Sequence, residues 1–223
     1  MRRTTQCFAL PPNNIGMQKE LPIITPIQPQ RREKPFDRRD WIFELKYDGF
    51  RGLAYIMDGK IRLRSKTTAI LQGFHTLKSA LEYELRVHDT VIDGEIVSFD
   101  PEGHIRFNQL MDRKGRIGYF AFDLLIHNGE DLRMLPLLER KQRLRRILPE
   151  GSDTLLYADH VPEHGVQLYE FVEANDQEGI IAKPADSPYN ESVTWYKIKN
   201  PHYSGLENRP DVGEFRSGRK RAS

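Results

Sequence analysis

The hydrophobic and polar positions of the chain alternate in short runs, which predict strands joined by tight turns. Apolar or alternating runs typical of strands cover residues 41–46, 52–57, 60–64, 91–99, 119–126, 155–158, 179–183 and 193–198. Asp58-Gly59 and the segment 127–130 are typical of hairpin turns. Helical spacing predicts helices over 74–85, 136–148 and 166–174. Strands outnumber helices and come in hairpins, so the pattern favours an α+β fold with mainly antiparallel sheets.

The two ends of the chain differ from this central part. Six prolines between residues 11 and 35 interrupt every candidate element, so residues 1–38 are predicted to be an extended segment lying on the domain. Residues 39–205 are predicted to form one domain. Residues 206–223 end in a basic, Gly- and Ser-containing run and are predicted to be a disordered tail.

The predicted helix over 136–148 has one apolar side, and its other face is strongly basic. That face carries Arg140, Lys141, Arg143, Arg145 and Arg146. Two interpretations stay open: this face and the basic tail contact nucleic-acid phosphates, or both are solvated.

Composition restricts the class of protein but not its function. The 223 residues carry 34 Lys and Arg against 32 Asp and Glu, a formal charge of +2, which gives no preference for nucleic acid. The single cysteine, Cys7, excludes an internal disulfide. No apolar run approaches the roughly 20 residues of a membrane span. We therefore expect a soluble, cytoplasmic protein that does not enter a membrane.

Candidate chemistry begins at the end of the strand predicted over 41–46. Lys46 lies there, followed by the turn residue Gly49, which brings Asp48 and Arg51 close. A lysine at a strand end can be partly desolvated, which lowers its pKa and frees the amine as a nucleophile. The alternative interpretation is an ordinary charged hairpin.

Several other predicted strands carry charge where an apolar residue is expected. Asp93 and Glu95 lie within an apolar strand, and burying carboxylates is costly unless a metal or a partner compensates. Lys197 and Lys199 alternate along a strand, so they point to one face, and an anion such as a phosphate would relieve their repulsion. Phe120 and Phe122 alternate in the same way and could pack in a core or stack on a planar base.

Five short motifs follow one another in the order ELKYDGFR, DGEIV, FAFDLL, EGIIAK and WYKIK. Together they resemble the covalent nucleotidyltransferase superfamily of DNA ligases, RNA ligases and capping enzymes. The segments PFDRRDWIFELKYDGFRGLAY and FDLLIHNGEDLR are most similar to bacterial ATP-dependent DNA ligases, including the ligase module of end-joining enzymes. The resemblance covers residues 21–205 and implies an ATP-grasp-like nucleotidyltransferase (adenylation) domain, with antiparallel sheets flanked by helices.

The resemblance also implies a role for each matching residue. Lys46 would become adenylated by ATP, in the presence of Mg²⁺ or Mn²⁺. Glu44 would lie by the adenine and Arg51 by the ribose. Lys66 falls where the family usually has an arginine that contacts phosphate. The remaining implied roles are the metal and ribose for Glu95 and Glu178, adenine stacking for Phe122 with Phe120 as second choice, and the α-phosphate for Lys183, Lys197 and Lys199.

The resemblance further implies a partner and raises a question about the second domain of the family. AMP would pass to the 5′-phosphate of nicked or broken DNA. Family ligases continue into an OB-fold, whereas 24 residues (200–223) follow Lys199, too few for that domain. We therefore expect an adenylation domain without an OB-fold, monomeric, with a partner protein supplying the OB-fold or DNA-end binding. Two alternatives stay open: RNA as the polynucleotide, or an accessory protein that binds nucleotide or DNA without ligating.

Overall fold

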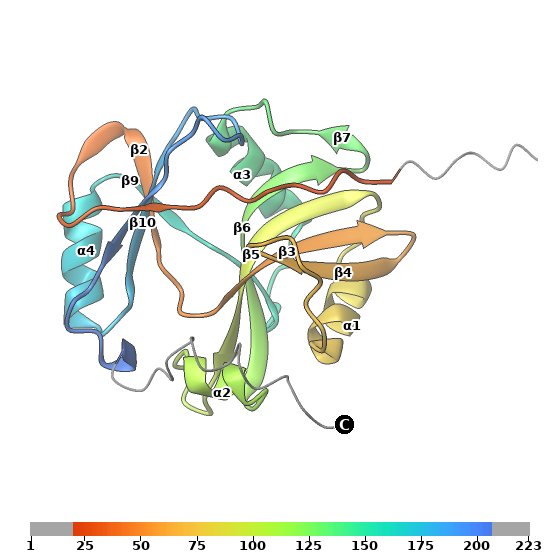
Figure 1. The fold of residues 1–223 in the computed structure, drawn as a ribbon, viewed down its shortest axis with the longest axis horizontal. Coiled ribbons are helices and arrows are strands. Elements are labelled where there is room, and N and C mark those ends of the chain that lie inside the picture. The colour runs from red at the N-terminus through yellow and green to blue at the C-terminus, as the bar shows by residue number, and fades with distance from the viewer. Residues whose placement is uncertain (1–19, 207–223) are drawn as a thin grey trace, which may run out of the picture.

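The computed structural model describes residues 20–206, which form two sheets lying side by side (Figure 1). The first sheet is five-stranded, in the order β1 (Gln30–Arg31), β11 (Tyr196–Lys199), β10 (Gly179–Pro184), β2 (Arg38–Leu45) and β9 (His160–Glu163). The second is six-stranded, in the order β4 (Lys60–Ser65), β3 (Phe50–Met57), β5 (Thr90–Phe99), β6 (Arg116–His127) and β7 (Glu130–Asp131), with β8 (Leu155–Tyr157) beside β6. Only the pairs β1–β11 and β6–β8 are parallel within the described part of the chain. The α+β, mainly antiparallel prediction is confirmed.

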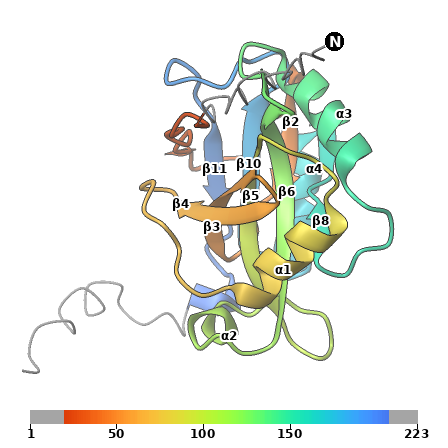
Figure 2. The ribbon, with the colours of Figure 1, turned by 90° about the vertical axis from the view of Figure 1, so that its right-hand side faces the viewer.

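Helices pack on both sheets (Figure 1 and Figure 2). They are α1 (His75–Glu84), α2 (Phe107–Met111), α3 (Leu137–Ile147) and α4 (Gly165–Ala174), followed by the short 3₁₀ helix η1 (Ser204–Leu206). α1 and α3 contact the second sheet and α4 contacts the first. Leu77 and Leu81 of α1 are fully buried, as the helical spacing of apolar residues predicts. The three predicted helices and both hairpin turns are confirmed.

One apolar cluster involves residues of both sheets and of the extended segment that precedes β1. Ile24 and Ile27 of this segment are buried in the same cluster as Phe122 and Trp195. The Ile24 backbone amide donates a 2.8 Å hydrogen bond to the Tyr55 hydroxyl. These contacts bring β1 alongside β11, so part of the chain predicted as irregular supplies a strand. The predictions for residues 1–19 and 207–223 lie outside the described residues.

Some elements gave no recognisable signal in the sequence. The strand β9 contains Pro162, which argues against a strand, but β9 is an outer strand of the first sheet and there proline is tolerated. The helix α2 has five residues, too few for a helical period to be visible. Conversely, the last predicted strand begins at Tyr196 and not at residue 193.

The prediction of an exposed basic face on α3 is wrong for Arg140 and Lys141. Arg140 is 0% and Lys141 1% exposed, because each binds a buried carboxylate. Arg143 forms ion pairs with two acidic side chains, Glu130 and Glu139. These three cations are all paired with acidic side chains. Of the predicted basic face, Arg145 and Arg146 form no ion pair with a described residue. No helix among residues 20–206 is long and apolar enough to cross a membrane.

Close packing of β5 against β6 predicts that Gly94→Ala is strongly destabilising. A Cβ at Gly94 would lie 2.4 Å from the Tyr119 ring and 2.7 Å from the backbone oxygen of Phe120. Overpacking of this kind costs about 1–3 kcal/mol. Gly59→Ala is the control, because its Cβ meets nothing within 4 Å and only its positive φ (+70°) is unfavourable. Urea unfolding should show the larger loss for Gly94→Ala, and equal losses would contradict the packing described here.

Candidate active site

A cleft of about 170 Å³ opens between the two sheets, and most of the residues singled out in the sequence line it. Glu44, Lys46 and Lys183 come from the first sheet or its end, whereas Arg51, Glu95 and Phe122 come from the second. The remaining lining residues are Gln28, Pro29, Leu45, Tyr47, Lys66, Ile181, Trp195 and Lys197. Residues of motifs about 150 positions apart in the chain, such as Lys46 and Lys197, therefore meet in one place.

Two predicted site residues, Glu178 and Lys199, do not line this cleft but lie next to it. Glu178 lines a neighbouring cavity that shares Lys46 with the cleft. The Lys199 ammonium lies 3.6 Å from a Glu178 carboxylate oxygen. Phe120, the second choice for stacking, faces elsewhere: its ring stacks on Tyr47 at 3.8 Å.

Lys46 is held at the end of β2 in an ion pair. Its backbone amide donates a 2.9 Å hydrogen bond to the Gly179 carbonyl, which ties the strand end to β10. Its ammonium lies 2.5 Å from Glu178 Oε2, and the side chain is 21% exposed. A solvent-accessible amine, fixed at its base and oriented by a carboxylate, has the setting that a nucleophilic lysine requires.

The Glu44 carboxylate lies between two lysines at the back of the cleft. Lys141 binds Oε1 and Lys183 binds Oε2, both at 2.6 Å. Burial alone would raise the pKa of Glu44, but the two ammonium groups outweigh it and hold that pKa below its usual range. One carboxylate shared by two lysines leaves one unit of positive charge there, which favours an anionic ligand.

Arg51 reaches the cleft as part of a buried network. Its guanidinium forms a bidentate ion pair with Asp93, at 2.6 and 2.5 Å, and Asp93 also accepts a 2.7 Å hydrogen bond from Tyr189. The guanidinium carbon lies 4.8 Å from the centre of the Phe122 ring. Asp93 is therefore compensated by Arg51, so this carboxylate needs no metal.

Lysines on the outer side of the cleft lie close enough to repel one another. Burial, followed by the ammonium groups of Lys199, Lys46 and Lys66, lowers the pKa of Lys197. A phosphate placed among these side chains would relieve that repulsion, as the alternating pattern of β11 predicts.

Glu95 and Glu178 are the acidic side chains that could share a cation. Burial raises the pKa of Glu95 to about 8, against the opposing effect of Lys46 and Arg51, and Glu178 raises it further. A divalent cation would favour the ionised form of Glu95. Within residues 20–206, no group of three or more acidic, histidine or cysteine side chains is placed so that it could hold a metal ion by itself. The donor set fits a cation such as Mg²⁺ that takes its other ligands from phosphates and water.

Sequence reasoning missed the groups that support these residues. The sequence pattern assigns Lys141 to the basic face of a predicted helix, and Tyr189 lies in none of the five motifs. Lys141 offered a weak signal, because a lysine four positions after the buried Leu137 falls on the apolar stripe of α3. Tyr189 lies in an irregular loop and offered none.

Comparison with known proteins agrees with this geometry. A family model described as "ATP dependent DNA ligase domain" matches residues 28–199. The chain belongs to this family of ligase domains. The matched segment contains both walls of the cleft, from Gln28 to Lys197. The fold resemblance inferred from the five motifs is thereby confirmed.

Individual ligases of the family cover the same part of the chain. The multifunctional non-homologous end joining protein LigD of Mycolicibacterium smegmatis is 31% identical over 169 residues, which cover 74% of this chain and 22% of that protein. LigD of Pseudomonas aeruginosa is 36% identical over 172 residues, covering 73% of this chain and 20% of that protein. A solved structure, "mycobacterial DNA ligase D complexed with ATP and MES", matches with a TM-score of 0.68 and 28% identity, over 79% of this chain and 60% of that one. The chain thus spans about a fifth of the length of the LigD relatives it matches.

The buried lysine of the cleft predicts a pH dependence of stability. Burial lowers the pKa of Lys183 from its ordinary value of 10.5 to about 8. Between these values the unfolded chain binds more protons than the folded chain, so this group makes the free energy of unfolding rise with pH. Wild type should therefore gain stability relative to Lys183→Met between about pH 8 and pH 10, as measured by urea unfolding.

The control for this comparison is Lys114→Met, because the Lys114 side chain is 73% exposed. Its stability difference from wild type should stay constant over the same pH range. A constant difference for Lys183→Met as well would contradict the burial of its ammonium group.

Proposed function

We propose that this domain reacts with ATP to form a covalent lysyl-AMP at Lys46. The observation that carries the proposal is the position of Lys46, which lies at the mouth of a cationic cleft and is ion-paired with Glu178 at 2.5 Å. Family membership supports ATP as the nucleotide. The rings of Phe122 and Trp195, with Glu44, offer a base-sized site, and Lys66, Lys183, Lys197 and Lys199 offer cations for phosphates.

The proposed step is an in-line displacement at the α-phosphorus. The free amine of Lys46 attacks, a nitrogen–phosphorus bond forms, and the bond to the pyrophosphate oxygen breaks. Glu178 is positioned to accept the proton that Lys46 must release. Lys197 and Lys199 would stabilise the charge that develops on the phosphoryl oxygens. A divalent cation held by Glu95 and Glu178 would supply charge neutralisation for the departing pyrophosphate.

A variant of the nucleophile tests this proposal. Lys46→Arg keeps the positive charge beside Glu178 but lacks a nucleophilic amine, because arginine is not deprotonated in proteins. With labelled ATP and Mg²⁺ or Mn²⁺, wild type should acquire covalent AMP and Lys46→Arg should acquire none. Lys114→Arg is the control and should label like wild type, because Lys114 is exposed and lines neither the cleft nor the neighbouring cavity. Wild type that binds ATP but never acquires the label would refute the proposal and favour a nucleotide-binding accessory role.

For the acceptor of AMP we propose the 5′-phosphate of a broken or nicked DNA strand. The LigD relatives named above are end-joining proteins, which supports DNA over the alternative of RNA. Comparing the sealing of nicked DNA and nicked RNA duplexes separates the two. Binding to a partner protein and a cytoplasmic location stay predictions.

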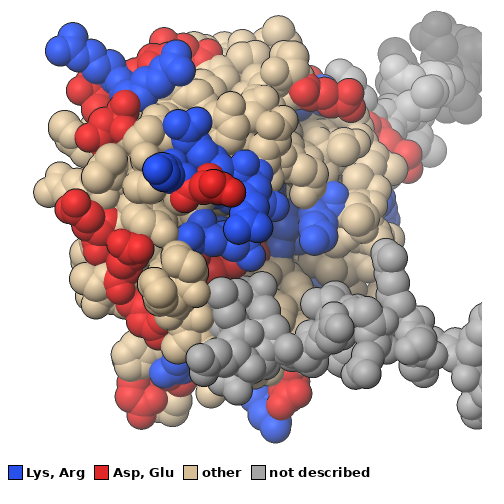
Figure 3. All heavy atoms as spheres, turned by 60° about the vertical axis from the view of Figure 1, so that its left-hand side comes forward, with Lys and Arg blue, Asp and Glu red and all other residues tan. Residues whose placement is uncertain are grey.

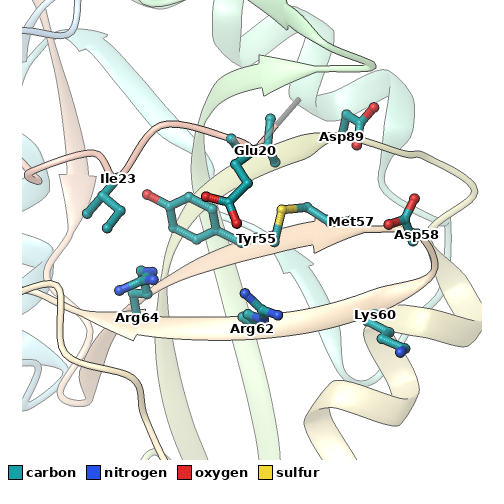
Figure 4. Close-up of a pocket in the computed structure, with 10 residues that line it drawn as sticks. Glu20, Ile23, Tyr55, Met57, Asp58, Lys60, Arg62, Arg64 and Asp89 are labelled. Atoms are coloured by element: carbon teal, nitrogen blue, oxygen red, sulfur yellow. The ribbon is translucent and has the colours of Figure 1, made fainter. Parts of the chain in front are cut away.

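A row of basic side chains on β4 supports contact with a polynucleotide. Lys60, Arg62 and Arg64 alternate with the buried residues Ile61 and Leu63, so they share the outer face of the strand, about 6.6 Å apart along it. They form one edge of a cavity of about 430 Å³ (Figure 4). The row continues to Lys66, at the cleft. No described residue forms an ion pair with Lys60, Arg62 or Lys66, although three acidic side chains (Glu20, Asp58 and Asp89) also line that cavity.

Figure 3 shows Lys and Arg side chains gathered in the middle of one face of the molecule, although the net charge is only +2. Clustering of this kind gives a local field for phosphates that the total charge does not reveal. The charge distribution therefore adds support to an anionic polymer as the second substrate.

Salt dependence tests the β4 row. The double variant Lys60→Gln/Arg62→Gln should reduce the slope of log K against log salt by about one to two, because each phosphate contact contributes about 0.9. Arg145→Gln/Arg146→Gln on α3 is the matched control and should leave the slope unchanged. Binding to nicked duplex DNA, measured by fluorescence anisotropy at several salt concentrations, gives both slopes. A reduction confined to the α3 variant would contradict the assignment.

A further inference from the structure

Lys141 of α3 is buried behind the cleft, where its ammonium group binds polar groups of three other segments of the chain. Its ammonium has three N–H donors, and three acceptors surround it: Glu44 Oε1 at 2.6 Å, the Ala158 carbonyl at 2.9 Å and the Phe122 carbonyl at 3.4 Å. The side chain is 1% exposed. The donors are therefore fully used, and Lys141 is fixed in place.

Two of these acceptors belong to opposite walls of the cleft. Glu44 lies on β2 of the first sheet and Phe122 on β6 of the second, and both line the cleft. One ammonium group thus joins the two walls from behind. Its hydrogen bonds set how far apart the Glu44 carboxylate and the Phe122 backbone lie.

The orientation of the Glu44 carboxylate depends on Lys141 together with Lys183. Each lysine binds one of the two oxygens, so the carboxylate plane is fixed. Lys183 also lies 4.2 Å from the Phe122 ring centre and 4.3 Å from that of Trp195. If Lys141 were neutral, Lys183 alone would compensate a buried carboxylate, and its charge would be less available to a nucleotide.

We propose that Lys141 is a positioning residue that fixes Glu44 and thereby sets the preference of the cleft for adenine. This inference rests on the proposed function, in which the base occupies the part of the cleft beside Glu44 and Phe122. A fixed carboxylate accepts a hydrogen bond from the exocyclic amine of adenine. The carbonyl oxygen at the same position of hypoxanthine would be repelled by it. A carboxylate free to turn discriminates less between the two bases.

Arg140 is a matched control for Lys141. It precedes Lys141 on α3, is equally buried, and forms a bidentate pair with Asp123 at 2.8 and 2.9 Å. Removing either cation leaves a carboxylate buried, so both variants lose stability. Asp123, however, does not line the cleft. Only the loss of Lys141 should therefore change how a nucleotide is selected.

The experiment measures self-adenylation with ATP and with inosine triphosphate for Lys141→Met and Arg140→Met, at a temperature where both are folded. Lys141→Met should raise KM for ATP and lower the preference for ATP by about tenfold each, the size expected for one lost hydrogen bond to a charged group, with kcat within threefold. Arg140→Met should leave KM and the preference within twofold. An unchanged preference in Lys141→Met, or an equal change in both variants, would overturn the inference.

Two further measurements keep the test decisive. Lys141→Gln can still donate to a backbone carbonyl but carries no charge, so it replaces Lys141→Met if that variant does not fold, with the same expected result. Calorimetric binding of the two nucleotides to Lys46→Arg and to Lys46→Arg/Lys141→Gln separates this inference from the proposed function. If wild type acquires no covalent AMP, the proposed reaction is refuted. A weaker preference for ATP in Lys46→Arg/Lys141→Gln than in Lys46→Arg would still support the role of Lys141.

Discussion

The structure depends on compensating carboxylates that are buried between or within its sheets. Glu44, Asp93, Asp123 and Glu178 are each at most 3% exposed, and each has a cationic partner, between 17 and 132 residues away in the chain. An uncompensated buried carboxylate would cost several kcal/mol, so the elements that carry the partners cannot shift independently. The pairs thereby fix α3 and both sheets relative to one another. Apolar packing fills the space around these pairs, and the contacts of Lys141 with Glu44 and with the Phe122 carbonyl set how far apart the walls of the cleft lie.

Charge is distributed unequally between the floor of the site and its mouth. In the interior behind the cleft, Asp93 and Asp123 are each paired with one arginine. Nearer the mouth, Lys66 and Lys197 have no matching acid among the described residues, and the pKa of Lys197 is lowered by its neighbours. The buried ion pairs hold the surrounding strands in place, and the lysines at the mouth are therefore positioned before an anion binds. Preorganisation of this kind reduces the cost of orienting groups around a transferring phosphoryl group.

The sequence indicated the strands, the hairpin turns and the long helices, because each leaves a local period in the order of residues. It also indicated the polar groups that line the cleft, because charge within an apolar strand is conspicuous. Lys141 shows where such reasoning ends: the sequence contains its type and spacing, but its partner Glu44 lies 97 residues away. The same limit applies to β1, two residues long and recognisable only by its pairing with β11, and to Pro162 in β9, which is acceptable only because that strand is at a sheet edge. Local propensity is visible in a sequence, whereas pairings that depend on the finished fold are not.

The parallel pairing of β1 with β11 has a consequence for the order in which the domain assembles. Arg31 pairs with Lys197, and Gln28 and Trp195 line the same cleft, so contacts around the site join segments separated by more than 160 residues. Closing so long a loop carries an entropic penalty that is recovered only when the contacts at its end form. During synthesis, therefore, the second sheet can fold from a continuous central segment while the cleft still lacks one wall. Nearly the whole domain must be synthesised before β1 can pair with β11, so a nascent chain lacks the complete cleft until synthesis has passed β11.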